Sequence, residues 1–137
     1  MEEVLSNWHE VVKNQDAKLL KSMLDKGAIF HSPILFKPQT GRKKVMVYLL
    51  AAAKMFEGSN FHYVKEVINE REAVLEFNAE IDGIHIDGVD IITINEEGLI
   101  TEFKVMVRPL KAIEKVGEKM RAYLEDLSLW GKLKLKL

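Results

Sequence analysis

The hydrophobic pattern of this chain changes its period twice, and these changes restrict the fold more than any other feature of the sequence. Up to about Phe56, apolar residues recur every three or four positions, as on one face of a helix. After Gly58 and as far as about residue 108, they alternate with polar residues, as in strands with one wet face. The helical period then returns. The order predicts an α+β protein in which helices pack on one face of a bent antiparallel sheet.

The first helical part divides into three predicted helices. The first covers about residues 4–12. A second begins after Asp16, whose side chain suits the N-cap position, and we expect Gly27 to end it. Residues 28–36 are expected to form a short strand or extended segment. The third helix is expected to begin at Gly41 and to end where the helical period stops.

Four main strands are expected in the alternating part, and turn residues separate three of them. Asp82-Gly83 forms one predicted turn, and residues 95–98 form a second, with Gly98 at the position that tolerates a positive φ. Pro109 is expected to end the last strand. The strands cover about residues 61–68, 75–81, 84–94 and 99–108.

The C-terminal part is predicted to be an amphipathic helix over about residues 110–128, added to a core of about residues 4–110. Its apolar face carries Ile113, Val116, Met120, Leu124 and Leu127. The tail, residues 129–137, alternates Lys and Leu after Gly131. It would suit an edge strand, a loose end or contact with an anionic surface. We expect residues 1–137 to form a single domain.

Charge and composition exclude several classes of protein. The formal net charge is −1, which argues against a nucleic-acid-binding protein with a basic face. The absence of cysteine excludes disulfides, thiol catalysis and zinc–cysteine sites, and it is compatible with a reducing compartment. The first ten residues hold no apolar signal segment, and no apolar run approaches a membrane span of about 20 residues. We therefore expect a cytoplasmic protein without membrane or nucleic-acid partners.

Several short motifs occur in a characteristic order along the chain: Trp8, Asp16, Ser32-Pro33, Gly41, Gly88-Val89-Asp90, Gly98-Leu99-Ile100 and Arg108-Pro109. With them, about residues 4–120 resemble the nuclear transport factor 2-like superfamily, and its SnoaL-like branch most. The resemblance implies a cone, in which a curved antiparallel sheet wraps around the N-terminal helices. It also implies an apolar pocket and dimers through the outer face of the sheet. The superfamily includes ketosteroid isomerases, polyketide cyclases, dehydratases and transport adaptors, so the fold alone implies no single reaction.

The resemblance to the isomerases can be followed residue by residue. The general-base aspartate of that branch corresponds to Ser32, the carboxylic acid of its oxyanion site to Asp90, and its helix-1 tyrosine to Trp8. A serine hydroxyl does not shuttle a proton as a carboxylate does unless a base lies beside it. Steroid isomerisation by that mechanism is therefore not expected, and a pocket with one acid is what remains.

Asp90 is the first candidate for chemistry. It interrupts a row of isoleucines at alternate positions from Ile84 to Ile94, where Gly88 is the other gap. On the concave face of a sheet it would be desolvated, so its pKa would rise and it could donate a proton or a hydrogen bond. Alternatively, Asp90 caps a turn after Gly88, or a bulge directs it to solvent.

His31 and Ser32 are the other catalytic candidates, because they interrupt an apolar stretch. Alternation makes them face opposite ways, and the resemblance places Ser32 toward the pocket. The alternative for Ser32 is a hydrogen bond with nearby backbone ahead of Pro33. His31 is expected outside or at the rim of the pocket, where it would be a structural residue or would titrate at the pocket mouth.

The predicted pocket wall is apolar and partly aromatic, with Trp8 as either core or wall. His85 and Asp87 could bind a metal, but no third ligand has a matching spacing, so we expect an outer-face pair, no metal and no cofactor. The residues expected to line the pocket are Trp8, Phe77, Ile92, Phe103 and Val105.

Three functions are compatible with these features. The first is binding of a small apolar molecule, with cofactor-free acid–base catalysis of the isomerase, cyclase or dehydratase type. The second is a non-catalytic carrier that uses the same pocket. The third is a protein-interaction module, which would leave Ile113, Val116 and Met120 as an exposed patch. Lys104, Met106 and Arg108 mix apolar and charged groups on the outer face, which predicts a homodimer through the sheet.

Overall fold

The computed structural model describes the backbone of residues 1–134 and the side chains of residues 1–126. Six strands form one sheet in the order β2-β1-β6-β5-β4-β3. Its strands are β1 Leu24–His31, β2 Gln39–Thr40, β3 His62–Ile68, β4 Glu72–Ile81, β5 Ile84–Ile94 and β6 Ile100–Arg108. The helices are α1 Glu2–Asn14, α2 Ala17–Met23, α3 Arg42–Phe56 and α4 Leu110–Lys134.

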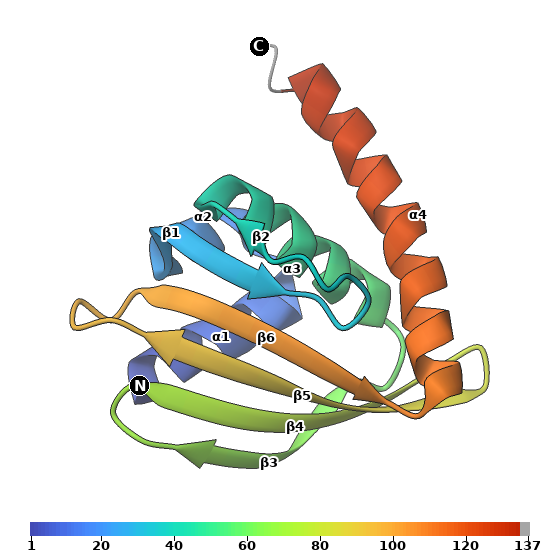
Figure 1. The fold of residues 1–137 in the computed structure, drawn as a ribbon, viewed down its shortest axis with the longest axis horizontal. Helices are drawn as coiled ribbons and strands as arrows, with labels where there is room; N and C mark the ends of the chain where they lie inside the picture. Colours follow the sequence, from blue (N-terminus) through green and yellow to red (C-terminus); the bar gives the residue numbers. More distant parts are fainter. Residues whose placement is uncertain (135–137) are drawn as a thin grey trace.

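The sheet curves, and α1, α2 and α3 lie on its concave side (Figure 1). This arrangement confirms the predicted α+β cone. One pairing differs from the antiparallel sheet that we expected, because β1 and β6 are parallel, with Phe30 beside Phe103. In chain order, β1 comes before α3, and β3 to β6 follow it. The parallel pair therefore places the first and the last strand of the chain side by side in the sheet.

Local chemistry explains most of the element boundaries. Asp16 caps α2, since its Oδ1 accepts the Leu19 N–H at 3.0 Å, as expected. Gly41 stands at the N-cap of α3, and Gly98 has a φ of 80° in the β5–β6 turn, both also as expected. The prediction that Gly27 ends α2 was wrong. The helix ends at Met23, because the buried Leu24 already pairs with Ile100 as the start of β1.

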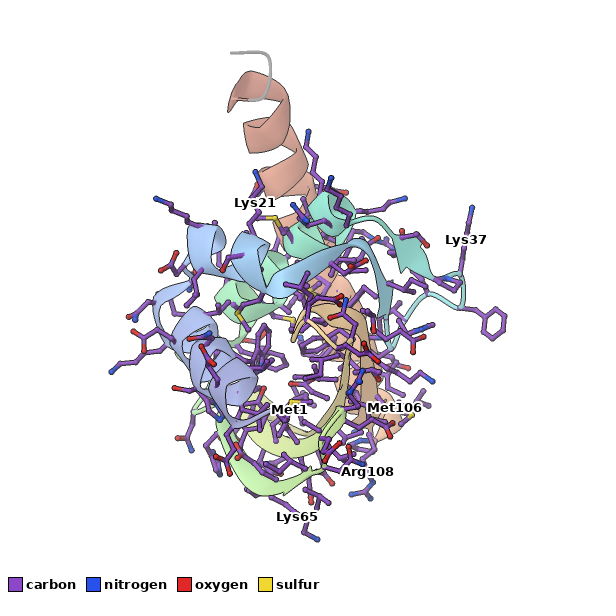
Figure 2. All side chains as sticks on the ribbon, turned by 90° about the vertical axis from the view of Figure 1, so that its left-hand side faces the viewer. Met1, Lys21, Lys37, Lys65, Met106 and Arg108 are labelled. Atoms are coloured by element: carbon purple, nitrogen blue, oxygen red, sulfur yellow. The ribbon has the colours of Figure 1, made fainter. Side chains whose placement is uncertain are left out.

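Alternation along β4, β5 and β6 gives the sheet one covered and one exposed face. Side chains on the concave face pack against α1 and α3, whereas Met106 and Arg108 lie on the outer face, away from α1 and α3 (Figure 2). The buried core includes Leu5, Val11, Leu20, Phe30, Leu49, Leu75, Ile92 and Phe103. The concave face is thus where the buried chemistry of this fold lies.

Helix α4 packs on α3, β5 and β6 (Figure 1). Val116 is only 3% exposed, and Ile113 and Met120 are half-buried, so the exposed patch expected for an interaction module is not found. Leu127 lies outside the described side chains. No helix in the described part of the chain combines the length and apolar character of a membrane span.

The C-terminal tail continues α4 as far as Lys134, so the edge strand, one of the three alternatives for this tail, is not formed over that part. Lys and Leu are both good helix formers, and they extend a helix that is already nucleated. Residues 135–137 lie outside the described residues.

Candidate active site

A chain of two hydrogen bonds crosses the interior of the cone. The Trp8 Nε1–H donates to the Tyr63 hydroxyl oxygen at 2.8 Å. The Tyr63 O–H in turn donates to Asp90 Oδ2 at 2.6 Å. The three side chains come from α1, β3 and β5, so the site forms only when the sheet closes on the first helix.

Each of these residues reaches the interior for a local reason. Trp8 lies on the buried face of α1, with Leu5 and Val11 one turn away on either side. Asp90 belongs to the inward row of β5, as the isoleucine alternation predicts. Tyr63 pairs with Phe77 across β3 and β4, just before a register shift in β3. Its ring is held edge-on by the rings of its aromatic neighbours, Phe61 and Phe77.

Burial controls the electrostatics of Asp90. The residue is 5% exposed, and desolvation raises the pKa of its carboxyl from 3.8 to about 7, although the Tyr63 hydroxyl opposes part of this shift. Burial, and then the charge on Asp90, raises the pKa of Tyr63 well above its ordinary value. Tyr63 therefore stays a neutral donor, and Asp90 is the group that changes charge near neutral pH.

Asp90 faces a small inner cavity of about 50 Å³. Among the predicted lining residues, Trp8, Phe77, Phe103 and Val105 line this cavity. Ile92 does not; it is fully buried and packs in the core, where it pairs with Phe103 of β6. Among the described residues, Asp90 and Tyr63 are the ionisable side chains in this wall.

A larger outer chamber of about 480 Å³ adjoins the inner cavity. The two share the lining residues Phe30, Ala52, Phe56 and Val105. The outer chamber is bounded by α3, by the segment from Ser32 to Leu35, and by α4. Asp90 lines the inner cavity and not the outer chamber.

Ser32 does not join the hydrogen-bond chain. Its Oγ accepts the backbone N–H groups of Ile34 at 3.0 Å and Leu35 at 3.2 Å, so it holds the turn after β1. Ser32 also lines the outer chamber. The local role that the sequence left open for this serine is therefore the one that its contacts show.

His31 lies on the outer side, as expected from alternation. Its Nε2 is 3.0 Å from Glu102 Oε1, across the β1–β6 pair. It lines neither the inner cavity nor the outer chamber. The three predicted catalytic residues are thus not assembled in one place, and Asp90 alone of the three faces the inner cavity.

Tyr63 is the site residue that the sequence analysis missed. Most of β3 is exposed, and its alternation is weak, so the strand gave no clear inward face. The available indication was that Tyr63 follows Phe61 by two residues, so both rings share one face of the predicted strand. The next strand carries a third aromatic residue, Phe77. The register of β3 against β4, which pairs Tyr63 with Phe77, was needed to bring its hydroxyl within reach of Asp90 on β5.

His85 and Asp87, the predicted outer-face pair, contact charged side chains on that face. Asp87 Oδ2 accepts a hydrogen bond from Arg108 at 3.0 Å, and His85 Nε2 lies 3.8 Å from Glu80. Within the described part of the chain, no three His, Cys, Asp or Glu side chains are grouped to hold a metal ion.

A comparison with protein families shows which family the chain belongs to. A family model described as a SnoaL-like domain matches residues 5–103. The chain belongs to this SnoaL-like family. The predicted membership of the nuclear transport factor 2-like superfamily is thereby confirmed. A search of curated proteins finds no match.

Solved structures agree with the family. A steroid delta-isomerase from Pseudomonas aeruginosa has 30% identity, a TM-score of 0.87 and 93% coverage of each chain. An uncharacterised protein from Silicibacter pomeroyi with a cystatin-like fold has 29% identity and a TM-score of 0.81, covering 99% of this chain and 92% of its own. An epoxide hydrolase/cyclase-like enzyme of pyran ring formation in salinomycin has 14% identity and a TM-score of 0.63, covering 78% and 89%; it shows the fold alone.

Proposed function

We propose that this SnoaL-like protein binds a small apolar carbonyl compound, with protonated Asp90 donating a hydrogen bond to the carbonyl oxygen. The observation that carries the proposal is a buried carboxyl, with a pKa raised to about 7, at the wall of an apolar cavity. Tyr63 occupies Oδ2, which leaves Oδ1 for the ligand. The similarity to a steroid delta-isomerase supports a ligand of this class.

Such a donor stabilises negative charge that develops on a carbonyl oxygen. The hydrogen bond is strong at a buried, mainly apolar site, because the low local dielectric strengthens it. Acid assistance of this kind serves enolisation, ring closure or loss of water from a carbonyl compound. We therefore propose cofactor-free chemistry of the isomerase, cyclase or dehydratase type, in which Asp90 is the acid and Tyr63 positions it.

A carrier without catalysis is the second candidate, and the environment of Ser32 favours it. The hydroxyl that stands in place of the isomerase base accepts two backbone N–H groups, and no second carboxylate among the described residues lines the inner cavity. Proton abstraction from a carbon next to the carbonyl would then lack a protein base. Incorporation of deuterium at that carbon in heavy water separates the two functions, because a carrier leaves the exchange rate unchanged.

We also propose a homodimer through the outer face of the sheet. Val89 pairs with Met106 and Ile91 pairs with Val74, so apolar side chains run across three strands. Met106 is 49% exposed and Val74 38%. A second copy of the sheet would cover this strip.

The test of ligand binding uses 2-undecanone labelled with ¹³C at the carbonyl. We expect a saturable downfield shift of the carbonyl resonance that is largest below neutral pH and fades as Asp90 ionises. In Asp90→Asn the shift should be smaller and independent of pH, since an amide donates less strongly and does not titrate. Asp87→Asn is the matched control, because Asp87 lies on the same strand but on the opposite face. Absence of a saturable shift in the unmodified protein would contradict the proposal.

A further inference from the structure

We infer that α4 determines which ligand this site accepts, and that the outer chamber takes a neutral, elongated apolar body whose narrow oxygen-bearing end reaches Asp90. The inference rests on the proposed function, because it specifies the ligand of the same site. Its basis is that two adjoining spaces of very different size share four lining residues.

The inner cavity is too small for the body of a ligand. A volume of about 50 Å³ holds a few water-sized groups, which is enough for a carbonyl oxygen and the carbons beside it. The outer chamber has about 480 Å³ and is lined mainly by apolar side chains. A molecule that touches Asp90 must therefore place most of its length outside the inner cavity, in the outer chamber.

Helix α4 supplies one whole wall of the outer chamber, through Val116, Gly117, Met120 and Leu124 among others. The family model matches residues 5–103, so this wall lies beyond the matched range, whereas the steroid delta-isomerase structure covers 93% of this chain. The inner cavity, in contrast, is lined entirely by residues before 106. Asp90 thus lies within the matched range, whereas α4 lies beyond it and closes the chamber that would hold the body of the ligand.

Gly117 sets how closely α4 approaches the segment after β1. Glycine in a helix interior is less favourable than alanine, yet Gly117 stands in the middle of α4 and faces the chamber. A Cβ added there would meet the Cδ1 of Ile34 at 3.5 Å, an ordinary contact, so the neighbouring atoms do not require glycine. Ile34 fills the space that a side chain at residue 117 would need, since three of its side-chain atoms lie 3.5–3.8 Å from the position of that Cβ. A larger residue at 117 would therefore push against Ile34 and change the distance between α4 and the segment after β1.

The charges at the chamber give no preference for a charged ligand. Arg121 and Glu125 both line it, one helical turn apart and opposite in sign. Met120 and Leu124 lie beside them on the same helix. The chamber therefore suits a neutral molecule whose far end is hydrocarbon.

The experiment compares three ketones with the same methyl ketone end, each labelled with ¹³C at the carbonyl: 2-pentanone, 2-undecanone and 10-oxoundecanoate. We expect 2-undecanone to bind at least about tenfold more tightly than 2-pentanone, because each buried methylene adds to the affinity. We expect 10-oxoundecanoate to bind no more tightly than 2-undecanone. Equal affinity of the short and long ketones, or tighter binding of the carboxylate, would overturn the inference.

Substitutions in α4 test the wall itself. Gly117→Leu should weaken 2-undecanone by about tenfold or more and leave 2-pentanone within about twofold. Gly117→Ala should raise the midpoint of thermal unfolding and weaken only the long ketone, which keeps the test valid if the leucine variant fails to fold. Ala122→Leu, at an exposed position of α4, is the matched control and should change neither affinity.

The proposed function and the role of α4 can be disproved independently of each other. If no ketone gives a saturable shift that depends on Asp90, the proposed function is wrong. If 2-pentanone and 2-undecanone both bind at Asp90 but Gly117→Leu weakens both equally or neither, the role of α4 is wrong and the proposed function stands.

Discussion

The hydroxyl oxygen of Tyr63 lies 2.6 Å from Asp90 Oδ2, and this bond connects an exposed edge strand to a buried carboxyl. Tyr63 donates to Asp90 while it accepts the indole N–H of Trp8. Its single proton is therefore committed to one oxygen of Asp90. The titration of Asp90, the stability of the cone and the donor that a ligand meets all depend on this contact.

The first prediction is that Asp90→Asn removes a pH-dependent cost of folding. The folded pKa of Asp90 is raised from 3.8 to about 7, so ionisation favours the unfolded state as pH climbs above 3.8, and the cost is complete above about 7. The raised pKa corresponds to at most about 4 kcal/mol. Urea unfolding near pH 5 and near pH 8 should show a larger loss of stability for the unmodified protein than for Asp90→Asn. Parallel pH profiles for the two proteins would contradict this, and Asp87→Asn should follow the unmodified protein.

The second prediction concerns Tyr63→Phe. The substitution keeps the ring but leaves the Trp8 N–H without its acceptor and Asp90 without the bond that lowers its pKa. We expect a loss of about 1–3 kcal/mol in the free energy of unfolding and a further rise in the Asp90 pKa. A carboxyl-selective NMR titration measures the pKa directly. A pKa that is unchanged or lower would show that the Tyr63 bond does not hold the carboxylate.

A third prediction follows from the contact between Gly88 and Phe77. A Cβ at Gly88 would lie 2.3 Å from Phe77 Cζ, so Gly88→Ala forces the Phe77 ring to move. The ring lines the inner cavity, and overpacking of this kind typically costs about 1–3 kcal/mol. We expect lower stability in urea and a weaker carbonyl shift of labelled 2-undecanone. Gly27→Ala is the control, because its added Cβ meets only Asp25 Oδ2, at 3.4 Å. Equal stability of the two variants would mean that the ring has room elsewhere.

Much of this fold could be predicted because its elements carry local patterns. The isoleucine row of β5 placed Asp90 on the buried face, and Asp16 and Gly41 marked the starts of two helices. The parallel pairing of β1 with β6 could not be predicted in this way, since it joins residues more than 70 positions apart, such as Phe30 and Phe103. The hydrophobic period of a strand shows which of its faces is buried, but it does not show which other strand pairs with it.

The same limit applies to the site. Asp90 stands out within its own strand, whereas Tyr63 acquires its role from the register between β3 and β4. Ser32 was placed toward the pocket by analogy, yet its hydroxyl is used by the turn that it starts. The division into an inner cavity and an outer chamber depends on α4, whose position on α3 the sequence did not specify.

The fourth prediction tests the proposed dimer. Met106 lies on the outer face, opposite Val89, and is 49% exposed, so Met106→Glu should cost the isolated protomer little. In a dimer, two copies of this carboxylate would be buried against an apolar strip without partners, which is strongly unfavourable. Sedimentation equilibrium at micromolar concentration should therefore show a dimer for the unmodified protein and a monomer for Met106→Glu, with similar circular dichroism spectra. Ala122→Glu adds the same charge at an exposed position of α4 and should leave the dimer intact. A monomer in the unmodified protein would remove the outer sheet face as an interface.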